Sequence, residues 1–136
     1  MQYSRGSAQK PSELSIVTKA KELCSYVVTI TQRSPKQFRF TFTSRMQNLC
    51  LDIIENIYLA NETFVGGENM RSQYEQRLKH QHIALTKIKQ LAYFAQLATE
   101  CGAILSKQFE HIAKISTECQ FLLGGWIKND KVRFKI

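Results

Sequence analysis

Apolar residues recur at intervals of three and four along most of the chain, which is the spacing of one face of an α-helix. The first such stretch begins at Ser12, a good N-cap residue, and ends at Ser34, because proline at position 35 pushes the preceding residue out of the helical region. This pattern predicts an amphipathic helix of about five turns. Its stripe consists of Val17, Ala20, Cys24, Val27 and Thr31, widened by Leu23, Val28 and Ile30.

The segment Phe38–Thr43 contains a local conflict. Its aromatic and polar residues alternate, which is typical of a β-strand. No second segment shows this alternation, and a lone strand cannot pair its backbone groups, so we expect these residues to form the first turns of a second helix. Pro35 suits the first position of such a helix because its missing N–H is not needed there.

The second helix carries two neighbouring apolar facets. The main facet predicts a bundle core and consists of Phe42, Met46, Leu49, Cys50, Ile53 and Ile57. Leu51, Ile54 and Tyr58 form the second facet. Because a bundle core needs only one stripe, we predict that the second facet contacts another subunit, although a large core would also absorb it.

A loop and a third helix follow. The segment Glu62–Asn69, with its two adjacent glycines, predicts the loop. The third helix is expected to begin between Met70 and Ser72 and to run to about Cys101, with Gly102 as its C-cap. Its predicted stripe consists of Tyr74, Leu78, Leu85, Ile88, Ala92 and Ala95, flanked by Ala84, Leu91 and Ala98.

The last helix is expected to begin at Ser106, a good N-cap residue, and to end near Lys128. Its predicted stripe consists of Phe109, Ile112, Ile115, Cys119, Leu122 and Trp126. Gly124 and Gly125 lie inside this helix, where each glycine costs about 1 kcal/mol relative to alanine. We therefore predict that another helix approaches closely at the glycine pair, and we assign the adjacent Trp126 to a subunit contact.

These segments predict an all-α fold, an up-down-up-down four-helix bundle, because short turns join consecutive amphipathic helices. We expect a flexible basic N-terminal tail at residues 1–11, the bundle at 12–128 and a basic C-terminal tail at 129–136. No apolar run is long enough to cross a bilayer, and no signal peptide is visible, so we expect a cytoplasmic location. Four cysteines without CxxC spacing indicate buried free thiols in a reducing compartment: Cys24, Cys50, Cys101 and Cys119.

Composition adds a class of partner to this fold. The 136 residues are 43% hydrophobic, which is enough for a core, and carry a formal net charge of +8. This excess attracts polyanions such as RNA, DNA or an acidic protein face, although a basic surface kept for solubility has the same composition. We predict two nucleic-acid-binding groups, Arg33, Lys36, Arg39 and Arg45 in the first and Arg71, Arg77, Lys79, Lys87 and Lys89 in the second.

The two basic groups are expected at opposite ends of one protomer, because the second and third helices run antiparallel. Each group has a simpler alternative, a solvated helix face without a partner. Two phenylalanines, Phe38 and Phe40, lie within the first group, where an exposed ring would stack on a nucleic-acid base. For these two and Phe42 we favour ordinary core packing, because aromatic side chains mainly fill cores.

No residue pattern indicates a catalytic or metal site. His80 and His82 are two positions apart and face different sides of a helix, and His111 belongs to no ExxH pair. Cys101 and His111 are the nearest thiol and imidazole in the sequence, and nothing else supports a nucleophile there. We therefore expect no enzymatic activity, cofactor, metal, membrane or small-molecule substrate.

Three segments resemble the accessory variability determinant proteins of diversity-generating retroelements: IVTKAKELCSYV, SPKQFRFTFTSRMQNLCLDIIENIYLAN and LSKQFEHIAKISTECQFLLGGWIK. The resemblance extends from Leu14 to Lys128. Its most characteristic pieces are Ser34-Pro35-Lys36 with Arg39-Phe40, Ala60-Asn61, and Leu123-Gly124-Gly125-Trp126-Ile127-Lys128. The related intervening-sequence proteins found within 23S ribosomal RNA genes share the bundle but look less similar in these motifs.

The resemblance implies a homopentameric barrel of four-helix protomers. It also implies binding to the reverse transcriptase and the template RNA of the retroelement, in support of mutagenic cDNA synthesis, with no catalytic activity in the accessory protein itself. It assigns no individual contact residues, so the basic positions named above rest on the placement of charge. The alternative that stays open is a structural oligomeric bundle that docks an acidic protein partner and has no nucleic-acid role.

Overall fold

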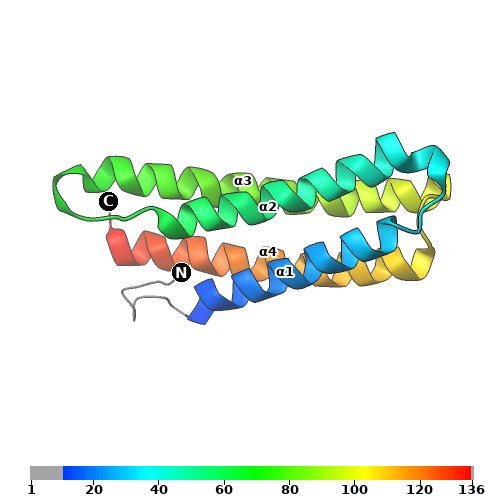
Figure 1. The fold of residues 1–136 in the computed structure, drawn as a ribbon. Helices are drawn as coiled ribbons and strands as arrows, with labels where there is room; N and C mark the ends of the chain where they lie inside the picture. Colours follow the sequence, from blue (N-terminus) through cyan, green and yellow to red (C-terminus); the bar gives the residue numbers. More distant parts are fainter. Residues whose placement is uncertain (1–10, 136) are drawn as a thin grey trace.

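Four long helices make up most of the described structure. The computed structural model describes residues 11–135, with side chains from residue 15 onward. The long helices are α1 (Pro11–Thr31), α2 (Ser44–Glu62), α3 (Met70–Cys101) and α4 (Ser106–Phe134), as Figure 1 shows. Three short helical turns connect them, η1 (Lys36–Phe38), η2 (Arg39–Thr43) and η3 (Gly67–Asn69).

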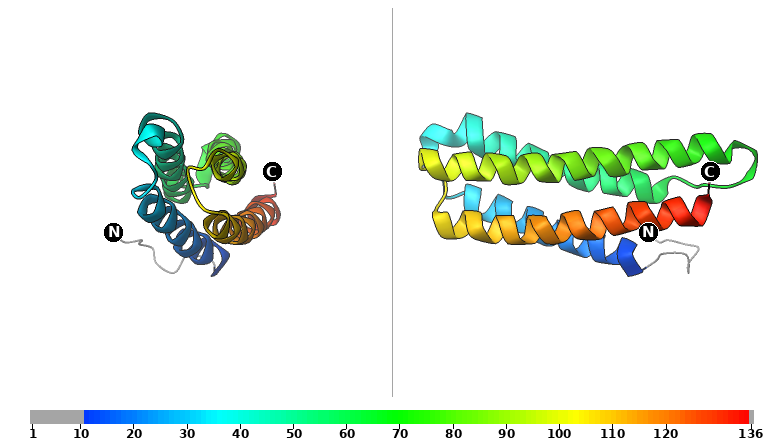
Figure 2. Two further views of the ribbon diagram at one scale, coloured as in Figure 1. Left: turned by 90° about the vertical axis from the view of Figure 1, so that its right-hand side faces the viewer. Right: turned by 180° about the vertical axis from the view of Figure 1, so that it is seen from behind.

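The helices run alternately up and down the bundle, so α1 and α3 point one way and α2 and α4 the other (Figure 1). Helix α2 packs beside α3 and α1 beside α4, while α1–α2 and α3–α4 contacts close the other two sides (Figure 2). Residues 11–135 contain no strand. The predicted all-α, up-down-up-down four-helix bundle is therefore confirmed.

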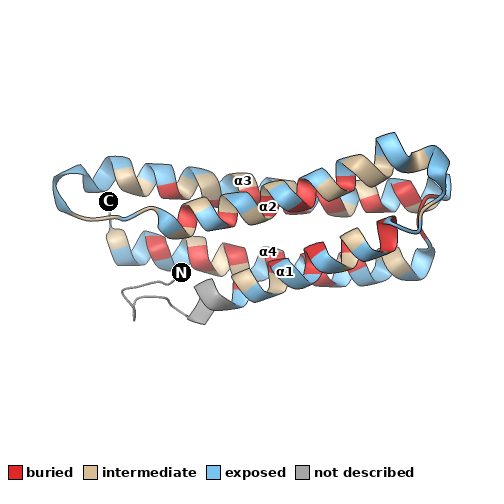
Figure 3. Ribbon diagram, viewed as in Figure 1, coloured by how far each residue is buried: buried red, intermediate tan, exposed pale blue. Residues whose placement is uncertain are grey.

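Buried residues recur along all four helices (Figure 3). On α1 the predicted stripe is buried except for Val17 and Val28, which are half-buried. On α2 the predicted main facet is also confirmed, since it is buried apart from the half-buried Phe42. The strict helical spacing of apolar residues in these two helices was therefore sufficient to locate their core faces.

The core stripe of α3 differs from the predicted one. The apolar residues at its centre are Ala84, Ile88, Leu91, Ala95 and Ala98, three of which were expected only beside the stripe. The predicted members Tyr74, Leu78, Leu85 and Ala92 are half-buried. The reason is that Arg77 and Gln81 occupy two core positions in the first half of the helix. Apolar periodicity therefore did not identify the core face of α3, because two of its positions are polar.

Between α1 and α2 the strand-like phenylalanine segment is helical, as predicted. Lys36–Phe38 form a 3₁₀ turn, and Arg39–Thr43 form a single π-helical turn in which the Ser44 N–H donates to the Arg39 carbonyl. A π-helical turn pairs residues five apart and so shifts the register of the side chains around the helix. This shift determines which phenylalanines of the segment reach the core.

Helix α4 extends beyond its predicted end. It runs to Phe134, and Asp130 near that end is buried. Most of the expected C-terminal tail, from residue 129 to residue 134, is therefore part of the bundle. Trp126, Asp130 and Phe134 follow one another at intervals of four, which is the helical spacing that continues the core face of α4.

The predicted caps at the α3–α4 turn are correct to within one residue. Gly102 has a φ of 87°, so the left-handed C-cap of α3 is confirmed. Ser106 is the first helical residue of α4, and Leu105 takes the N-cap position that was assigned to Ser106. The Gln108 side chain accepts a hydrogen bond from the Leu105 N–H at 2.9 Å, which satisfies a backbone donor at the start of the helix.

The predicted close helix approach at Gly124 and Gly125 is wrong for the helices of this protomer. A Cβ atom added at either position would meet no atom of the described residues within 4 Å. The cost of two glycines inside a helix is therefore not offset by packing against the described part of the protomer.

The predicted N-terminal tail is largely outside the described residues, which begin at Pro11. Helix α1 starts at that residue, one position before the predicted cap Ser12, whose side chain lies outside the described part. Among the helices from residue 11 to residue 135, none is long and apolar enough to span a membrane.

Candidate nucleic-acid interface

The first basic group lies at the end of the bundle where α1 leads into α2 and where α3 ends (Figure 1). Arg33, Lys36, Arg39 and Arg45 are all exposed there. Within residues 15–135 no carboxylate forms an ion pair with any of them. The segment from Arg33 to Arg45 contains no acidic residue, so its four positive charges face solvent together. A phosphate or a carboxylate from outside the protomer has direct access to them.

The second basic group begins toward the opposite end, where α3 starts, as the antiparallel helices predict. Three of its members are exposed: Arg71, Lys79 and Lys89. Lys87 forms an ion pair with Asp52 of α2, with its Nζ atom 3.5 Å from the carboxylate, so its charge is already partly neutralised. The group therefore presents fewer available charges than the sequence indicated.

Arg77 is the one predicted contact residue of this group that the fold removes from the surface. Its side chain is 5% exposed, and the predicted nucleic-acid contact is wrong for this residue. Its Nε donates to Asp130 Oδ2 at 2.6 Å, and its Nη2 donates to Oδ1 at 3.3 Å. Its Nη1 donates to the Ala60 carbonyl at 3.3 Å, and its guanidinium lies 5.2 Å from the centroid of the Trp126 ring. Arg77 thus joins α2, α3 and α4 inside the core.

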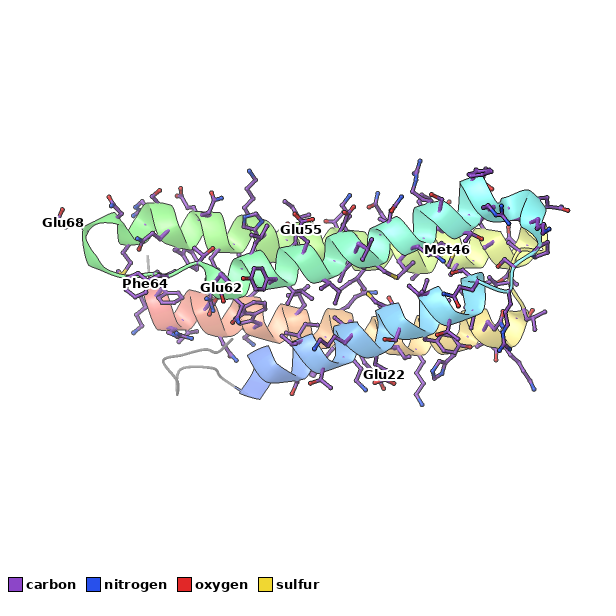
Figure 4. The ribbon with its side chains drawn as sticks, in the orientation of Figure 1. Glu22, Met46, Glu55, Glu62, Phe64 and Glu68 are labelled. Carbon is purple, nitrogen blue, oxygen red and sulfur yellow. The ribbon has the colours of Figure 1, made fainter. Side chains whose placement is uncertain are left out.

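The end of α4 brings further basic residues to the second group. The rings of Tyr74 and Phe134 lie 5.8 Å apart between centroids, which places the end of α4 beside the start of α3. The exposed lysines of this segment are Lys128, Lys131 and Lys135. Glu62 and Glu68 lie at the same end (Figure 4), so its positive charge is mixed with negative charge. The segment of the first group, from Arg33 to Arg45, contains no acidic residue of its own.

The four predicted subunit-contact residues divide into two classes. Leu51 and Tyr58 are 65% and 57% exposed, so they form an apolar facet on the surface of the protomer, with the half-buried Ile54 beside them. Trp126 is only 1% exposed. Its assignment to a subunit contact is therefore wrong, because the ring lies on the core face of α4 under the guanidinium of Arg77.

The phenylalanines of the α1–α2 connection also have different surroundings. Phe38 and Phe42 pack against the core, edge to face with ring centroids 5.9 Å apart, as predicted. Phe40 is 86% exposed, so the prediction of core packing is wrong for this residue. The π-helical turn is the physical reason, since it changes the direction in which the middle residue of the segment points.

Phe40 stands at the edge of a hollow in the surface between the start of α2 and the end of α3. The hollow has a volume of about 420 Å³ and is lined by Phe40, Thr41, Phe42, Ser44, Arg45, Asn48, Phe94 and Leu97. The guanidinium of Arg45 lies 5.8 Å from the centroid of the Phe94 ring, which is the geometry of a cation–π contact. Sequence patterns missed this site because it combines residues about 50 positions apart that only antiparallel packing brings together.

The thiols offer little chemistry. All four predicted free cysteines are confirmed as free, but Cys101 is exposed rather than buried as expected. A hydrogen bond with Cys24, together with burial, holds the pKa of the Cys50 thiol far above its ordinary value. Burial raises the pKa of Cys119 to about 12, so this thiol stays protonated near neutral pH. In the described chain, no three or more His, Cys, Asp or Glu side chains are arranged to hold a metal ion.

Comparisons with known proteins establish the fold. No protein-family model matches the sequence. No curated protein matches it significantly. Among solved structures, the chain is similar to a protein of unknown function from the S23 ribosomal protein family of Bacteroides thetaiotaomicron, with a TM-score of 0.72 and 20% sequence identity. The match covers 86% of this chain and 98% of the other. At this level of identity the likeness shows a shared four-helix bundle.

Proposed function

We propose that this chain is a cytoplasmic, non-catalytic accessory protein of a diversity-generating retroelement. In this role it assembles into a homo-oligomer, a pentameric barrel, and binds the reverse transcriptase and the template RNA to support mutagenic cDNA synthesis. DNA is a further polyanion that the same surface accepts. The sequence resemblance over Leu14–Lys128 and the four-helix fold that the chain shares with an S23 family protein support the proposal.

The observation that carries the proposal is the exposed basic group at the α1–α2 end. Arg33, Lys36 and Arg39 meet no carboxylate within the described residues, and Arg45 contacts an aromatic ring instead. Each such charge that neutralises a phosphate releases counterions, which favours binding. Repetition of the group around a ring multiplies the phosphate contacts without any new residue.

A salt series with a structured RNA tests the proposal. The apparent affinity should fall linearly on a logarithmic plot, with a slope of about −0.7 to −0.9 per phosphate contacted. The triple variant Arg33→Gln, Lys36→Gln and Arg39→Gln should bind more weakly and show a shallower slope. All three side chains are exposed, so the fold should not change.

Substitutions in the second basic group provide the matched comparison. The variant Arg71→Gln, Lys79→Gln and Lys89→Gln removes the same charge from three equally exposed positions on α3. We expect a smaller loss of affinity, because these three charges are spread along α3, whereas Arg33, Lys36 and Arg39 fall in one short segment. Wild-type protein without measurable affinity for RNA, or equal binding by wild type and the first triple variant, would contradict the proposed RNA-binding role.

A second candidate function is a structural oligomer that docks an acidic protein and has no nucleic-acid role. The exposed apolar facet of Leu51 and Tyr58 favours it, because apolar surface is covered by protein contacts rather than by phosphates. Co-purification of a partner protein that survives nuclease treatment, together with absent RNA affinity, would support this second function.

A further inference from the structure

The surface around Phe40 combines exposed aromatic rings with unpaired positive charge. A π-helical turn is rare and occurs often at functional sites, and here it holds Phe40 almost entirely in water. Burial of a phenylalanine ring contributes substantially to the stability of the fold, and an exposed ring makes no such contribution. Tyr93 is exposed as well, and its ring centroid lies 6.5 Å from that of Phe94, which lines the hollow. The aromatic surface therefore extends beyond the hollow.

The hollow itself has the composition of a site for a flat, partly polar group. Phe40, Phe42, Phe94 and Leu97 provide its apolar lining. The polar side chains in the lining supply hydroxyl and amide groups that donate and accept hydrogen bonds, namely Thr41, Ser44 and Asn48. Its volume of about 420 Å³ falls within the range of small-molecule sites, roughly 300–1,000 Å³.

The positive charge next to the hollow suits a ligand in which an anionic group is attached to the flat, partly polar group. Arg45 lines the hollow and lies over the Phe94 ring, and no carboxylate among the described residues pairs with it. Arg39 and Lys36 precede the hollow residues in the chain and are exposed, and no carboxylate of the described residues pairs with them. A ligand with an aromatic part and a phosphate would satisfy both features.

We infer that this hollow binds one unpaired nucleotide of an RNA. The base stacks on Phe40 and Phe94, its polar edge reaches Asn48 and Ser44, and Arg45 and its basic neighbours bind the adjoining phosphate. The base provides the aromatic face that sequence-tolerant stacking requires, and the arginine provides a cation beside it. This inference rests on the proposed RNA-binding function and adds to it a preference for single-stranded or looped RNA.

Fluorescence of 2-aminopurine in a single-stranded RNA oligonucleotide provides the test, with a blunt RNA duplex of the same length as reference. Stacking on an aromatic side chain should quench the fluorophore when wild-type protein is added. The variants Phe40→Leu and Phe94→Leu keep apolar bulk and lose the aromatic face. We expect them to lose the quenching and at least about fivefold in affinity for the single strand, since base stacking is worth that much or more.

Two controls separate stacking from charge. Phe121→Leu changes a similarly exposed phenylalanine on α4, away from the hollow, and should leave quenching and affinity unchanged. The affinity of Phe40→Leu for the duplex and its salt slope should also equal those of wild type, because no positive charge has been removed. Phe40 is exposed, so thermal unfolding of this variant should match wild type.

The outcomes distinguish this inference from the proposed function. Salt-dependent RNA binding by wild type, without quenching and without a loss in Phe40→Leu, would overturn the nucleotide site and leave the proposed function standing. Absence of any RNA binding would overturn both. A loss of self-association in Phe40→Leu, with RNA affinity unchanged, would also overturn the nucleotide site and assign the hollow to a contact between copies.

Discussion

Asp130 shows at the scale of a single residue how a charge is accommodated in the core of the bundle. Its carboxylate accepts hydrogen bonds from the Arg77 guanidinium and, at 2.8 Å, from the Gln81 side chain. Arg133 lies 3.9 Å from the same carboxylate. The charge of Asp130 also contributes to raising the pKa of Tyr74, after burial as the larger cause. A buried ion pair of this kind is costly to break, because one partner is left as an uncompensated charge.

The variant Asp130→Asn should lower the free energy of unfolding by about 3–5 kcal/mol, because it leaves the buried Arg77 guanidinium without its counter-charge. Chemical denaturation of the purified protein measures this change. The matched control is Asp52→Asn, which removes the partner of Lys87 on the surface and should cost less than about 1 kcal/mol. Equal small effects of both variants would contradict a structural role for the buried pair.

At the scale of helices, α4 differs most from the sequence-based expectation. Its last turns hold Asp130, and its glycine pair has open space where another helix was expected. Glycine destabilises a helix interior because its backbone loses more entropy on folding than that of any other residue. Gly124 and Gly125 thus weaken α4 without a compensating contact from the described residues.

Replacement of Gly124 or Gly125 by alanine should therefore stabilise the protomer by about 0.5–1 kcal/mol per site. Thermal or chemical unfolding under dilute conditions measures the change. Gly102→Ala is the control with the opposite sign, because its φ of 87° is a left-handed conformation that disfavours a side chain. A different outcome is that Gly124→Ala destabilises an oligomer while it stabilises the monomer. That outcome would identify the glycine pair as a surface that a neighbouring copy approaches.

At the scale of the whole molecule, the exposed apolar facet of α2 is the surface that we propose for contacts between copies of the chain. Leu51 and Tyr58 lie on an exposed facet of a helix whose neighbouring facet already fills the core. Contacts that repeat head to tail between different surfaces of identical subunits close into rings when the rotation between subunits permits. The proposed pentamer requires an interface of this type, and we propose that the facet supplies one of its two surfaces.

The double variant Leu51→Glu and Tyr58→Glu should convert the oligomer into a monomer with unchanged helix content, because charges would then occupy an apolar contact. Light scattering measures the mass, and circular dichroism measures the helix content. Phe121→Glu is the control, since it places a charge at another exposed apolar position, on α4. A monomeric wild type would contradict the proposed oligomer, and dissociation by the control alone would move the interface to α4.

Much of the basic surface was predictable, because the location of charged residues on an exposed helix or turn can be inferred without tertiary information. Arg33, Lys36, Arg39 and Arg45 fall in one short segment, so local sequence sufficed to group them. Arg77 was misassigned because the identity of a residue does not show whether an arginine lies on the surface or in the core. Only the presence of Asp130, 53 positions away, makes burial of this arginine favourable.

The sequence by itself determined the number of helices, most of their ends and the core faces of α1 and α2. These features depend on the spacing of apolar residues and on local signals such as Pro35 and Gly102, which act within a few residues. The tertiary structure alone decided that α3 buries Arg77 and Gln81, that Trp126 is internal, and that Phe40 faces water beside Phe94. Each of these depends on contacts between distant segments, for which the local pattern holds no signal.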